Sequence, residues 1–373
     1  MIRVLFIFGT RPEAIKLCPI VLHMRQRREV FDVRVCVTAQ HRAMLDQVLA
    51  TFQVKADHDL DIMLPGQTLF QSSSRMLAAL GPVLEDAKPD MVLVQGDTTT
   101  TLFGALAAFY LQIPVGHVEA GLRTGDMSQP FPEEMNRVLT GRLAGLHFAA
   151  TDRAAQNLSS EGVGKPSVVI TGNSGIDAVL YVRDGLERKE LASCLHIPQL
   201  DPGRRLIVVT AHRRESFGEA FEDICRALGT LAEREDLQIV FPVHPNPNVQ
   251  GPVKRHLSSH PNVLLIEPLD YLPFVDLMRR AYILLTDSGG IQEEGPSLGK
   301  PVLVMREKTE RPEAVEAGTA ILVGTSPAKI IRETTRLLDN PADYERMART
   351  HNPYGDGHAS ERITSAIEAY FSR

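Results

Sequence analysis

Three acidic side chains lie at predicted strand ends or in loops of the first half of the chain, and their type suits acid–base chemistry. Asp97 and Glu119 stand at the ends of apolar runs, and Glu133 follows a loop that ends in Pro130-Phe131-Pro132. Acid–base catalysis needs titratable groups that converge, and carboxylates in consecutive loops can supply them. Each acid alone has a structural alternative, because a carboxylate at a helix start also caps the helix or offsets its dipole. Together the three predict an acid–base site.

Two cations occur in the turn that follows the first apolar run, at Arg11 and Lys16. Pro12 and Glu13, which lie between them, suit the first turn of a helix, where proline is tolerated and an acid offsets the helix dipole. That structural role leaves the two cations unexplained. We therefore expect Arg11 and Lys16 to bind an anion or to take part in catalysis.

Histidine and arginine side chains follow apolar runs in the second half of the chain. His212 and Arg213 come directly after Leu206–Thr210, and His244 follows the next run. A single histidine more often has a structural role, but the adjacent arginine at a strand end favours a functional role for His212. His212 and His244 lack the sequence spacing of metal ligands, so the sequence predicts no metal site.

The segment Asp287 to Glu294 has the composition of a nucleotide site. Ser288, Gly289 and Gly290 stand at a predicted helix start, where exposed amide groups bind phosphate readily. Glu294, one turn further on, has two carboxylate oxygens that suit the two hydroxyl groups of a ribose. The structural alternative is that first-turn glutamates only offset the dipole of the helix.

Short β-branched runs alternate with longer amphipathic stretches along nearly the whole chain, which is typical of parallel sheets with crossover helices. The predicted strands are Arg3–Phe8, Asp32–Thr38, Met91–Gln95, Pro114–Val118, His147–Ala149, Val168–Thr171, Leu206–Thr210, Gln238–Phe241, Val263–Ile266, Tyr282–Thr286, Pro301–Val304 and Ile321–Val323. The predicted helices include Pro12–Gln26, Ala43–Phe52, Leu69–Glu85, Leu102–Leu111, Glu133–Leu143, Phe217–Glu233 and Pro327–Leu338. The expected fold class is α/β, with two Rossmann-like doubly wound domains facing across a cleft. Ligands of such sheets bind at the carboxyl ends of the strands, where the polar residues above are expected.

A charged segment rich in helix breakers separates the two series of elements. Residues 184–205 are expected to contain a charged helix, followed by Ile197–Gly203 with two prolines and a glycine. We expect the domain border near this segment. The length of 373 residues agrees with two domains of ordinary size.

The composition is that of an ordinary globular protein. The 40 basic and 46 acidic side chains leave a net charge of −6, and 43% of the residues are hydrophobic. This balance argues against a nucleic-acid-binding surface. No apolar stretch approaches the roughly 20 residues of a membrane span, and no N-terminal stretch has the form of a secretory signal. We therefore expect a cytoplasmic protein that does not insert into a membrane.

Redox and cofactor motifs are not found in the sequence. The four cysteines lack the spacing of metal ligands or disulfides, and we expect free thiols. No G-x-G-x-x-G follows the first apolar run, and the segment around Gly299 and Lys300 lacks the remaining residues of a P-loop. The sequence therefore predicts no bound cofactor.

The motifs of both halves are similar to those of one family. They are Gly9–Lys16, Thr38–Arg42, Gly96–Thr100, His117–Arg123, Thr210–Glu215, Asp287–Glu294, Arg311–Glu313 and Asn352–Gly357. From end to end the chain resembles the bacterial non-hydrolysing UDP-N-acetylglucosamine 2-epimerases. The resemblance implies a glycosyltransferase-B-like pair of domains at residues 1–172 and 173–356, with a C-terminal helix at 357–373 that packs back on the first. It also implies a homodimer and a role in cell-surface polysaccharide biosynthesis.

The resemblance further implies a reaction and a set of roles. The enzyme would convert UDP-N-acetylglucosamine reversibly to UDP-N-acetylmannosamine, by anti elimination of UDP to 2-acetamidoglucal and re-addition. Asp97, Glu119 and Glu133 would then act near the sugar ring. Groups at the leaving diphosphate would be Arg11, Lys16, His212, Arg213, Ser288, Gly289 and Gly290. Glu294 would hold the ribose and Phe274 the uracil, and a second UDP-N-acetylglucosamine would bind as an activator at Gln40, His41 and His244.

Four positions depart from the family pattern, and rival functions remain open. Gln95 stands where many members have histidine, Ser174-Gly175 where Thr-Val is common, and Gly295 where alanine is usual. A hydrolysing epimerase would release UDP and free N-acetylmannosamine. A glycosyltransferase would need an external acceptor, and a non-catalytic sensor would bind the UDP-sugar without turning it over.

Overall fold

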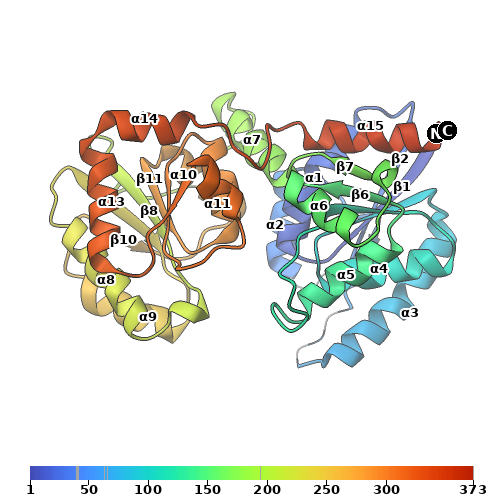
Figure 1. Cartoon of the computed structure of the whole chain (residues 1–373), viewed down its shortest axis with the longest axis horizontal. Coiled ribbons are helices and arrows are strands. Elements are labelled where there is room, and N and C mark those ends of the chain that lie inside the picture. The colour runs from blue at the N-terminus through green and yellow to red at the C-terminus, as the bar shows by residue number, and fades with distance from the viewer. Residues whose placement is uncertain (39–41, 63, 65, 194, 373) are drawn as a thin grey trace. The chain divides into compact units, whose positions relative to one another are not determined.

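The structure, a computed structural model, describes residues 1–38, 42–62, 64, 66–193 and 195–372. The chain forms two compact units, Met1–Ala178 with Tyr354–Arg373, and Val179–Pro353. Helix α7 (Ser174–Glu187) begins in the first unit and ends in the second, and the C-terminal segment returns to the first unit (Figure 1). The first unit is therefore built from both ends of the chain.

The described part of the first unit contains a parallel sheet of seven strands, in the order β3-β2-β1-β4-β5-β6-β7. Its strands are β1 (Ile2–Phe8), β2 (Phe31–Val37), β3 (His58–Asp59), β4 (Met91–Gln95), β5 (Val115–Ala120), β6 (Leu146–Ala149) and β7 (Val168–Ile170). The strand order reverses between β1 and β4. Ligands of doubly wound sheets bind beside this point, outside the carboxyl ends of the strands.

Helices cover both faces of this first sheet. They are α1 (Arg11–Arg25), α2 (Arg42–Thr51), α3 (Leu69–Ala87), α4 (Thr99–Tyr110), α5 (Glu133–Leu143), α6 (Asp152–Ser160) and α15 (Ala359–Phe371), with a 3-10 turn η1 (Lys165–Ser167). Helix α4 contacts α3 and α5, whereas α1 contacts α2 and α15. Figure 1 shows α15 on one side of the sheet and α3 and α4 on the other. The two helix layers bury the alternating side chains of the strands between them.

The C-terminal helix α15 is fixed to the first unit at both of its ends. The carboxylate of Asp177 accepts hydrogen bonds from the backbone N–H groups of Ala359 and Ser360, at 3.2 and 2.7 Å. These groups lie in the first turn of α15, where N–H groups have no partner within the helix. Near the other end, Glu368 forms an ion pair with Arg27, just after α1, at 2.8 Å.

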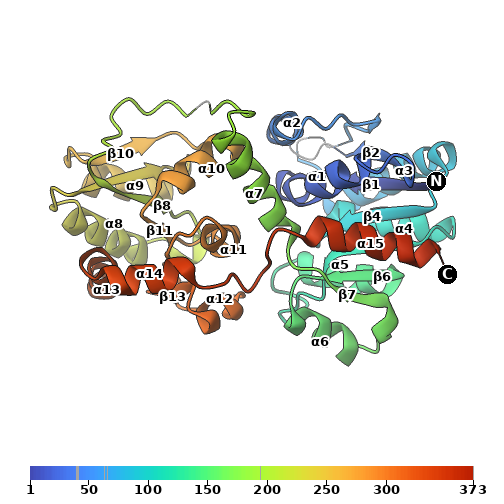
Figure 2. The same cartoon turned by 90° about the horizontal axis from the view of Figure 1, so that it is seen from above.

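The described part of the second unit contains a parallel sheet of six strands, in the order β10-β9-β8-β11-β12-β13. Its strands are β8 (Arg205–Thr210), β9 (Leu237–Pro242), β10 (Val263–Ile266), β11 (Ile283–Thr286), β12 (Val302–Val304) and β13 (Ala320–Leu322). Its helices are α8 (Glu219–Leu231), α9 (Pro247–Leu257), α10 (Tyr271–Arg280), α11 (Gly289–Ser297), α12 (Pro312–Ala317), α13 (Pro327–Asp339) and α14 (Pro341–Arg349), with a 3-10 turn η2 (Arg214–Ser216). Figure 2 shows α10 on one side of the sheet and α8 and α13 on the other.

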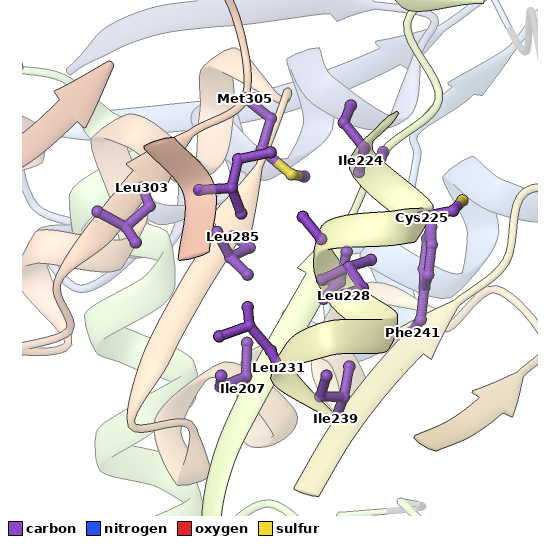
Figure 3. Packing of buried hydrophobic residues seen from close by; sticks show 14 of the residues in the cluster. Ile207, Ile224, Cys225, Leu228, Leu231, Ile239, Phe241, Leu285, Leu303 and Met305 are labelled. Atoms are coloured by element: carbon purple, nitrogen blue, oxygen red, sulfur yellow. The ribbon is translucent and has the colours of Figure 1, made fainter. Parts of the chain in front are cut away.

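One core of the second unit lies between its sheet and helix α8. Figure 3 shows Ile207, Ile239 and Leu285 of three neighbouring strands directed towards Leu228 and Leu231 of α8. These five side chains are at most 2% exposed. Burial of one such side chain stabilises the fold by about 1.5–3 kcal/mol, so this layer holds the strands, and the loops that follow them, in fixed register.

Gly295 allows α11 to lie unusually close to the opposite face of this sheet. A Cβ atom at this position would lie 2.7 Å from a methyl group of Leu284 in β11 and 2.8 Å from one of Val302 in β12. Neither distance is compatible with ordinary packing. Glycine, in place of the alanine usual at position 295, therefore leaves room for the side chains of Leu284 and Val302 that face it.

The predicted fold class, α/β with two Rossmann-like doubly wound domains, is confirmed by the two parallel sheets and their flanking helices. The expected charged helix within 184–205 is wrong in extent, because α7 ends at Glu187 and residues 188–193 and 195–204 contain no regular helix or strand. The short strand β3 and the helix α6 were not predicted. None of the described helices is long and apolar enough to cross a membrane.

Candidate functional site

Glu119 is held at the carboxyl edge of the first sheet by an ion pair with Lys16. The ammonium group of Lys16, from α1, lies 2.6 and 2.7 Å from the two carboxylate oxygens. Both side chains are less than 20% exposed. The amide of Gln95, at the end of β4, donates a hydrogen bond to Oε2, and Asn173 lies 3.5 Å from Oε1. Glu119 is thus surrounded by donors from three separate segments.

The backbone at Glu119 departs from regular strand geometry. Its φ angle is 62°, in the left-handed region that non-glycine residues seldom adopt, and the pairing of β5 with β6 shifts register between Val118 and Ala120. Such a conformation costs roughly 1–2 kcal/mol for a residue with a side chain. It persists because the surrounding sheet and the side-chain contacts of Glu119 fix it.

Asp97 lies in the turn after β4 and is paired with Arg137 of α5. The guanidinium Nε of Arg137 donates to Oδ2 of Asp97 at 3.1 Å, and its Nη1 lies 3.0 Å from Glu134. The pKa of Asp97 is raised, chiefly because burial disfavours its charge, and the nearby carboxylate of Glu119 acts in the same direction. The cations Arg137 and Lys16 oppose this change. Asp97 is therefore suited to hold a proton above the usual range of an aspartate.

His117 fixes the turn that carries Asp97. Its Nε2 lies 2.7 Å from the carbonyl oxygen of Gly96, and because a carbonyl only accepts, Nε2 carries the proton. Burial lowers the pKa of His117 to about 4, so the imidazole is neutral near neutral pH. His117 acts here as a structural donor rather than as a titrating group.

Glu13 joins the loop after β1 to the loop after β4. It completes a capping box with Thr10 at the start of α1, which explains why the helix begins there. Its Oε2 accepts from the N–H groups of Gly9 and Thr10 at 3.1 and 2.7 Å, and its Oε1 accepts from the hydroxyl of Thr98 at 2.7 Å. Thr98 in turn caps α4. The loop that carries Arg11 and Lys16 is thereby tied to the loop that carries Asp97.

Two of the predicted residues of the first unit are not drawn into this cluster. Glu133 opens α5 and is half-buried, with no hydrogen bond or ion pair to another described residue. Arg11, at the start of α1, is likewise half-buried and without such a partner among the described residues. Neighbouring Glu134 is buried and accepts from the N–H groups of Thr124 and Gly125, which is a structural role. The structure thus groups Lys16, Asp97 and Glu119 and leaves the other two at the periphery.

In the second unit, Asp287 organises the loop that carries His212 and Arg213. Asp287 is 1% exposed and follows β11. Its Oδ2 accepts from the backbone N–H groups of His212 and Arg213 at 2.6 and 2.7 Å, and its Oδ1 lies 3.4 Å from Nδ1 of His212. The imidazole of His212 is therefore oriented by a buried carboxylate. Asp287 was quoted in the sequence motif but not assigned a role.

His244 stacks on His212. The two ring centroids are 5.6 Å apart and the ring planes differ by 11°. Nδ1 of His244 accepts from the N–H of Asn246 at 3.2 Å, so a neutral His244 has its proton on Nε2. The other two residues predicted for the activator site, Gln40 and His41, lie outside the described residues.

The start of α11 has the features of an anion site. Ser288 is its N-cap residue, without a side-chain cap, and Gly289 and Gly290 are its first two residues. N–H groups at this position have no partner within the helix, and the helix dipole favours negative charge. The guanidinium of Arg311 lies directly over Gly289, because a Cβ there would come within 2.5 Å of Nη1, and it pairs with Glu293. The guanidinium group of Arg311 thus lies beside the N-terminus of α11.

Glu294 and Phe274 come from adjacent parts of the same unit. Glu294 is half-buried on α11, and its charge reaches the buried phenol of Tyr271 at the start of α10. Burial and, second, Glu294 raise the pKa of Tyr271. Phe274, one turn along α10, is half-buried. The residues proposed for ribose and base therefore lie on two helices of one unit, and the charge of Glu294 on α11 reaches Tyr271 in the first turn of α10.

Sequence reasoning missed several residues that complete these clusters, namely Gln95, Arg137, Asn173, Asp287 and Arg311. Gln95 and Asp287 stood next to selected residues, so their proximity was a usable signal. Arg137 and Asn173 lie some 40 and 54 residues from the carboxylates that they contact, and nothing in their local sequence indicates it.

Comparisons with known proteins identify the family of the chain. The family model described as UDP-N-acetylglucosamine 2-epimerase matches residues 23–368. A UDP-N-acetylglucosamine 2-epimerase of Escherichia coli strain K12 is 57% identical over 98% of both chains, and a probable one of Ralstonia nicotianae is 58% identical over 100% of both. The crystal structure of UDP-GlcNAc 2-epimerase from Neisseria meningitidis bound to UDP-GlcNAc is similar over 100% of both chains, with 49% identity and a TM-score of 0.89.

Proposed function

Because the chain belongs to the UDP-N-acetylglucosamine 2-epimerase family, we propose that it interconverts UDP-N-acetylglucosamine and UDP-N-acetylmannosamine. The similar structure from Neisseria meningitidis, which was solved with UDP-GlcNAc bound, supports this substrate. The observation that carries the proposal is the cluster of Lys16, Glu119 and Asp97 at the carboxyl edge of the first sheet. Two acids and a cation at this edge supply what proton transfer at a sugar carbon requires.

The proton at C2 of the sugar is not acidic, because no carbonyl group lies next to C2 in the ring. Direct removal would leave an unstabilised carbanion, so we propose elimination without hydrolysis. The C2 proton passes to a carboxylate, the C1–O bond breaks with its electron pair leaving on UDP, and C1=C2 forms in 2-acetamidoglucal. UDP then adds back to C1 while a proton reaches C2 from the opposite face. Atoms and charge balance, and no oxidant or reductant is consumed.

The two acids differ in a way that suits opposite proton transfers. Glu119 is ion-paired with Lys16 and is proposed as a base. Asp97, whose pKa is raised chiefly by burial, is proposed as a proton donor. Glu133 is proposed as a third carboxylate near the sugar ring. Arg11 is proposed as the first unit's contribution to anion binding, since it has no partner among the described residues.

The second unit is proposed to bind the nucleotide. The N–H groups of Gly289 and Gly290, with Ser288 before them, would stabilise negative charge on the diphosphate as it leaves. His212 and Arg213 would add donors, and Asp287 keeps their loop in place. We propose that Glu294 binds the ribose and Phe274 the uracil.

A homodimer and an activator site are further parts of the proposal. Helices α3, α4 and α5 carry large hydrophobic side chains that are unusually exposed, among them Phe70 at 87%, Phe109 at 56% and Leu139 at 42%. Exposed apolar side chains of this size favour a protein contact. His244, with Gln40 and His41, is proposed to bind a second UDP-N-acetylglucosamine. Sedimentation equilibrium tests the dimer, and a monomer at all concentrations would exclude it.

One experiment tests the reaction directly. Purified protein is incubated with UDP-N-acetylglucosamine in heavy water, and C2 is followed by proton NMR. We expect deuterium at C2 and the appearance of UDP-N-acetylmannosamine, with only traces of free UDP. Asp97→Asn, Glu119→Gln and Glu133→Gln should each lower turnover at least about a hundredfold. Release of free N-acetylmannosamine with one UDP for each sugar would instead identify a hydrolysing epimerase.

A further inference from the structure

Gln95 is placed to control the geometry of Glu119. It is the last residue of β4 and is 3% exposed. Its Nε2 donates to Oε2 of Glu119, across the paired strands β4 and β5. Its own backbone carbonyl accepts from the hydroxyl of Thr101 at 2.6 Å. The donor is therefore anchored to the sheet and to the start of α4.

We propose that Gln95 is a positioning residue, whose amide holds the carboxylate of Glu119 in the orientation that the reaction uses. The inference rests on the role of Glu119 in the proposed function. It goes beyond that function because it assigns a task to a neutral side chain that the mechanism itself does not require.

Two other contacts of Glu119, with Lys16 and Asn173, are less able to set its orientation. Lys16 reaches both oxygens at the end of a four-carbon chain with several rotatable bonds, so it can follow a carboxylate that moves. Asn173 lies 3.5 Å away, at the limit of a hydrogen bond. Gln95 has a shorter side chain on a buried central strand. A rigid donor of this kind selects one orientation of the carboxylate.

The backbone of Glu119 increases the need for such a donor. With φ at 62° and a register shift in β5, the carboxylate leaves the strand at a point that regular pleating does not define. The rotamers that suit this backbone differ from those of an ordinary strand. A fixed hydrogen bond removes the remaining freedom.

The charge of the surroundings determines what a neutral donor contributes. Among the described residues, the titratable groups that act on this region include Lys16 from α1, Asp97 after β4 with its partner Arg137 from α5, and His117 in β5 itself. A hydrogen bond donated to a carboxylate favours its ionised form, and Gln95 supplies one without adding a charge or titrating. The charge of Gln95 is therefore the same at every pH, and its hydrogen bond favours Glu119 most where Glu119 is ionised.

Gln95→Met tests the proposal, because methionine keeps the length of the side chain and removes the donor. We expect kcat for the epimerisation to fall about tenfold to a hundredfold, the range for loss of a hydrogen bond to a charged group, with KM changed less than about twofold. The acid limb of the pH profile of kcat should move to higher pH. Gln95→Glu, which sets a second carboxylate beside Glu119, should move it further.

Gln238→Met provides a matched control. Gln238 is a buried strand glutamine of the second unit, 5% exposed, whose amide bonds to the backbone of Gln199 and Asp201. Its loss should lower the melting temperature without moving the acid limb. Equal kcat and an unchanged acid limb in both Gln95 variants would overturn the proposal.

A readout that does not depend on turnover separates this inference from the proposed function. With 13C-labelled glutamate, the carboxyl signal of Glu119 is identified by its loss in Glu119→Gln and followed through an acid titration. We expect its midpoint to rise in Gln95→Met, even if wild-type protein showed no epimerisation and the proposed function failed. A midpoint identical to wild type would overturn the positioning role, whatever the activity.

Discussion

Gly9 is the position at which the smallest substitution should have the largest effect. It ends β1 and opens the loop that carries Arg11 and Lys16. A Cβ atom here would lie 2.0 Å from Oγ1 of Thr38 and 2.8 Å from Oγ1 of Thr100. Both hydroxyl groups are fully buried and bond to each other at 2.9 Å. Gly9→Ala therefore inserts a methyl group into a closed polar contact.

The magnitude follows from two losses. Overpacking in a dense interior typically costs about 1–3 kcal/mol. The clash also separates Thr38 from Thr100, and buried hydroxyl groups that lose their partner cost about 1–3 kcal/mol more. We expect a loss of about 2–6 kcal/mol in the free energy of unfolding. For a unit of this size, at about 2–4 °C for each kcal/mol, that is a decrease of about 4–24 °C in melting temperature. Turnover should fall as well, because the displaced loop carries Lys16 away from Glu119.

Calorimetry and urea unfolding measure the change, with Gly81→Ala as the matched control. Gly81 lies inside α3, and a Cβ there meets nothing within 4 Å. Alanine at this helical position should stabilise by about 0.5–1 kcal/mol, so the same substitution is expected to have opposite signs at the two sites. Thr38→Ala removes the closest obstructing atom. The double variant should be less destabilised than the sum of the single variants by at least about 1 kcal/mol. A loss below about 1 kcal/mol for Gly9→Ala, or strict additivity, would refute the reasoning.

Two further substitutions probe carboxylates outside the proposed chemistry. Arg123 binds Glu161 through two hydrogen bonds of 2.6 and 2.9 Å, and this contact is the main reason that the pKa of Glu161 is lowered. An acid whose pKa is lowered by folding stabilises the folded state above the ordinary glutamate range, and this stability is lost as pH falls. Arg123→Met should therefore destabilise the protein at pH 7 and approach the stability of wild type below about pH 4. Melting curves across this pH range measure the difference, and a difference that does not change with pH would contradict the prediction. Asp276, fully buried in α10, accepts from Ser193, Arg279 and Arg280. Asp276→Asn should cost about 2–3 kcal/mol in urea unfolding without changing the pH profile of turnover, and an unchanged midpoint would show that the cluster adds nothing.

The sequence predicts most of the scaffold because its signals are local. The apolar runs at Met91–Gln95 and Val263–Ile266 coincide with β4 and β10. All five residues of β4 are buried, and a strand buried on both faces reads as a nearly continuous apolar run. The helix predicted at Glu133–Leu143 is α5 with the same bounds. The strand β3 was missed because two residues carry no periodicity. Residues 188–193 form no regular helix although they include charged side chains, and Ser193 there donates a hydrogen bond to Asp276.

The site is less accessible to local reasoning, because its contacts join residues that are distant in sequence. Asp97, Glu119 and Lys16 were selected for their positions after strands, and the parallel topology brings those positions to one edge. The pairing of Asp97 with Arg137 depends on where α5 crosses that edge, which no spacing rule specifies. The left-handed backbone of Glu119 is also invisible in the sequence, since glutamate seldom adopts it. The residue types thus predict an acid–base site, whereas the orientation of its side chains required the fold.

The features that make the first unit suitable for chemistry also cost it stability. Burial raises the pKa of Asp97 and of Glu13, so each loses free energy when it ionises within the folded protein. Because the folded state then binds more protons than the unfolded chain, these two acids make the fold less stable as pH rises through their ordinary range. The same burial favours the protonated form of Asp97, which is the form that the proposed proton transfer to carbon needs. The free energy that burial of Asp97 costs the fold is therefore the same free energy that raises its pKa and suits it to donate a proton. The capping interactions of Glu13 and the ion pairs of Lys16 and Arg137 offset this cost, so the fold can retain the buried acid.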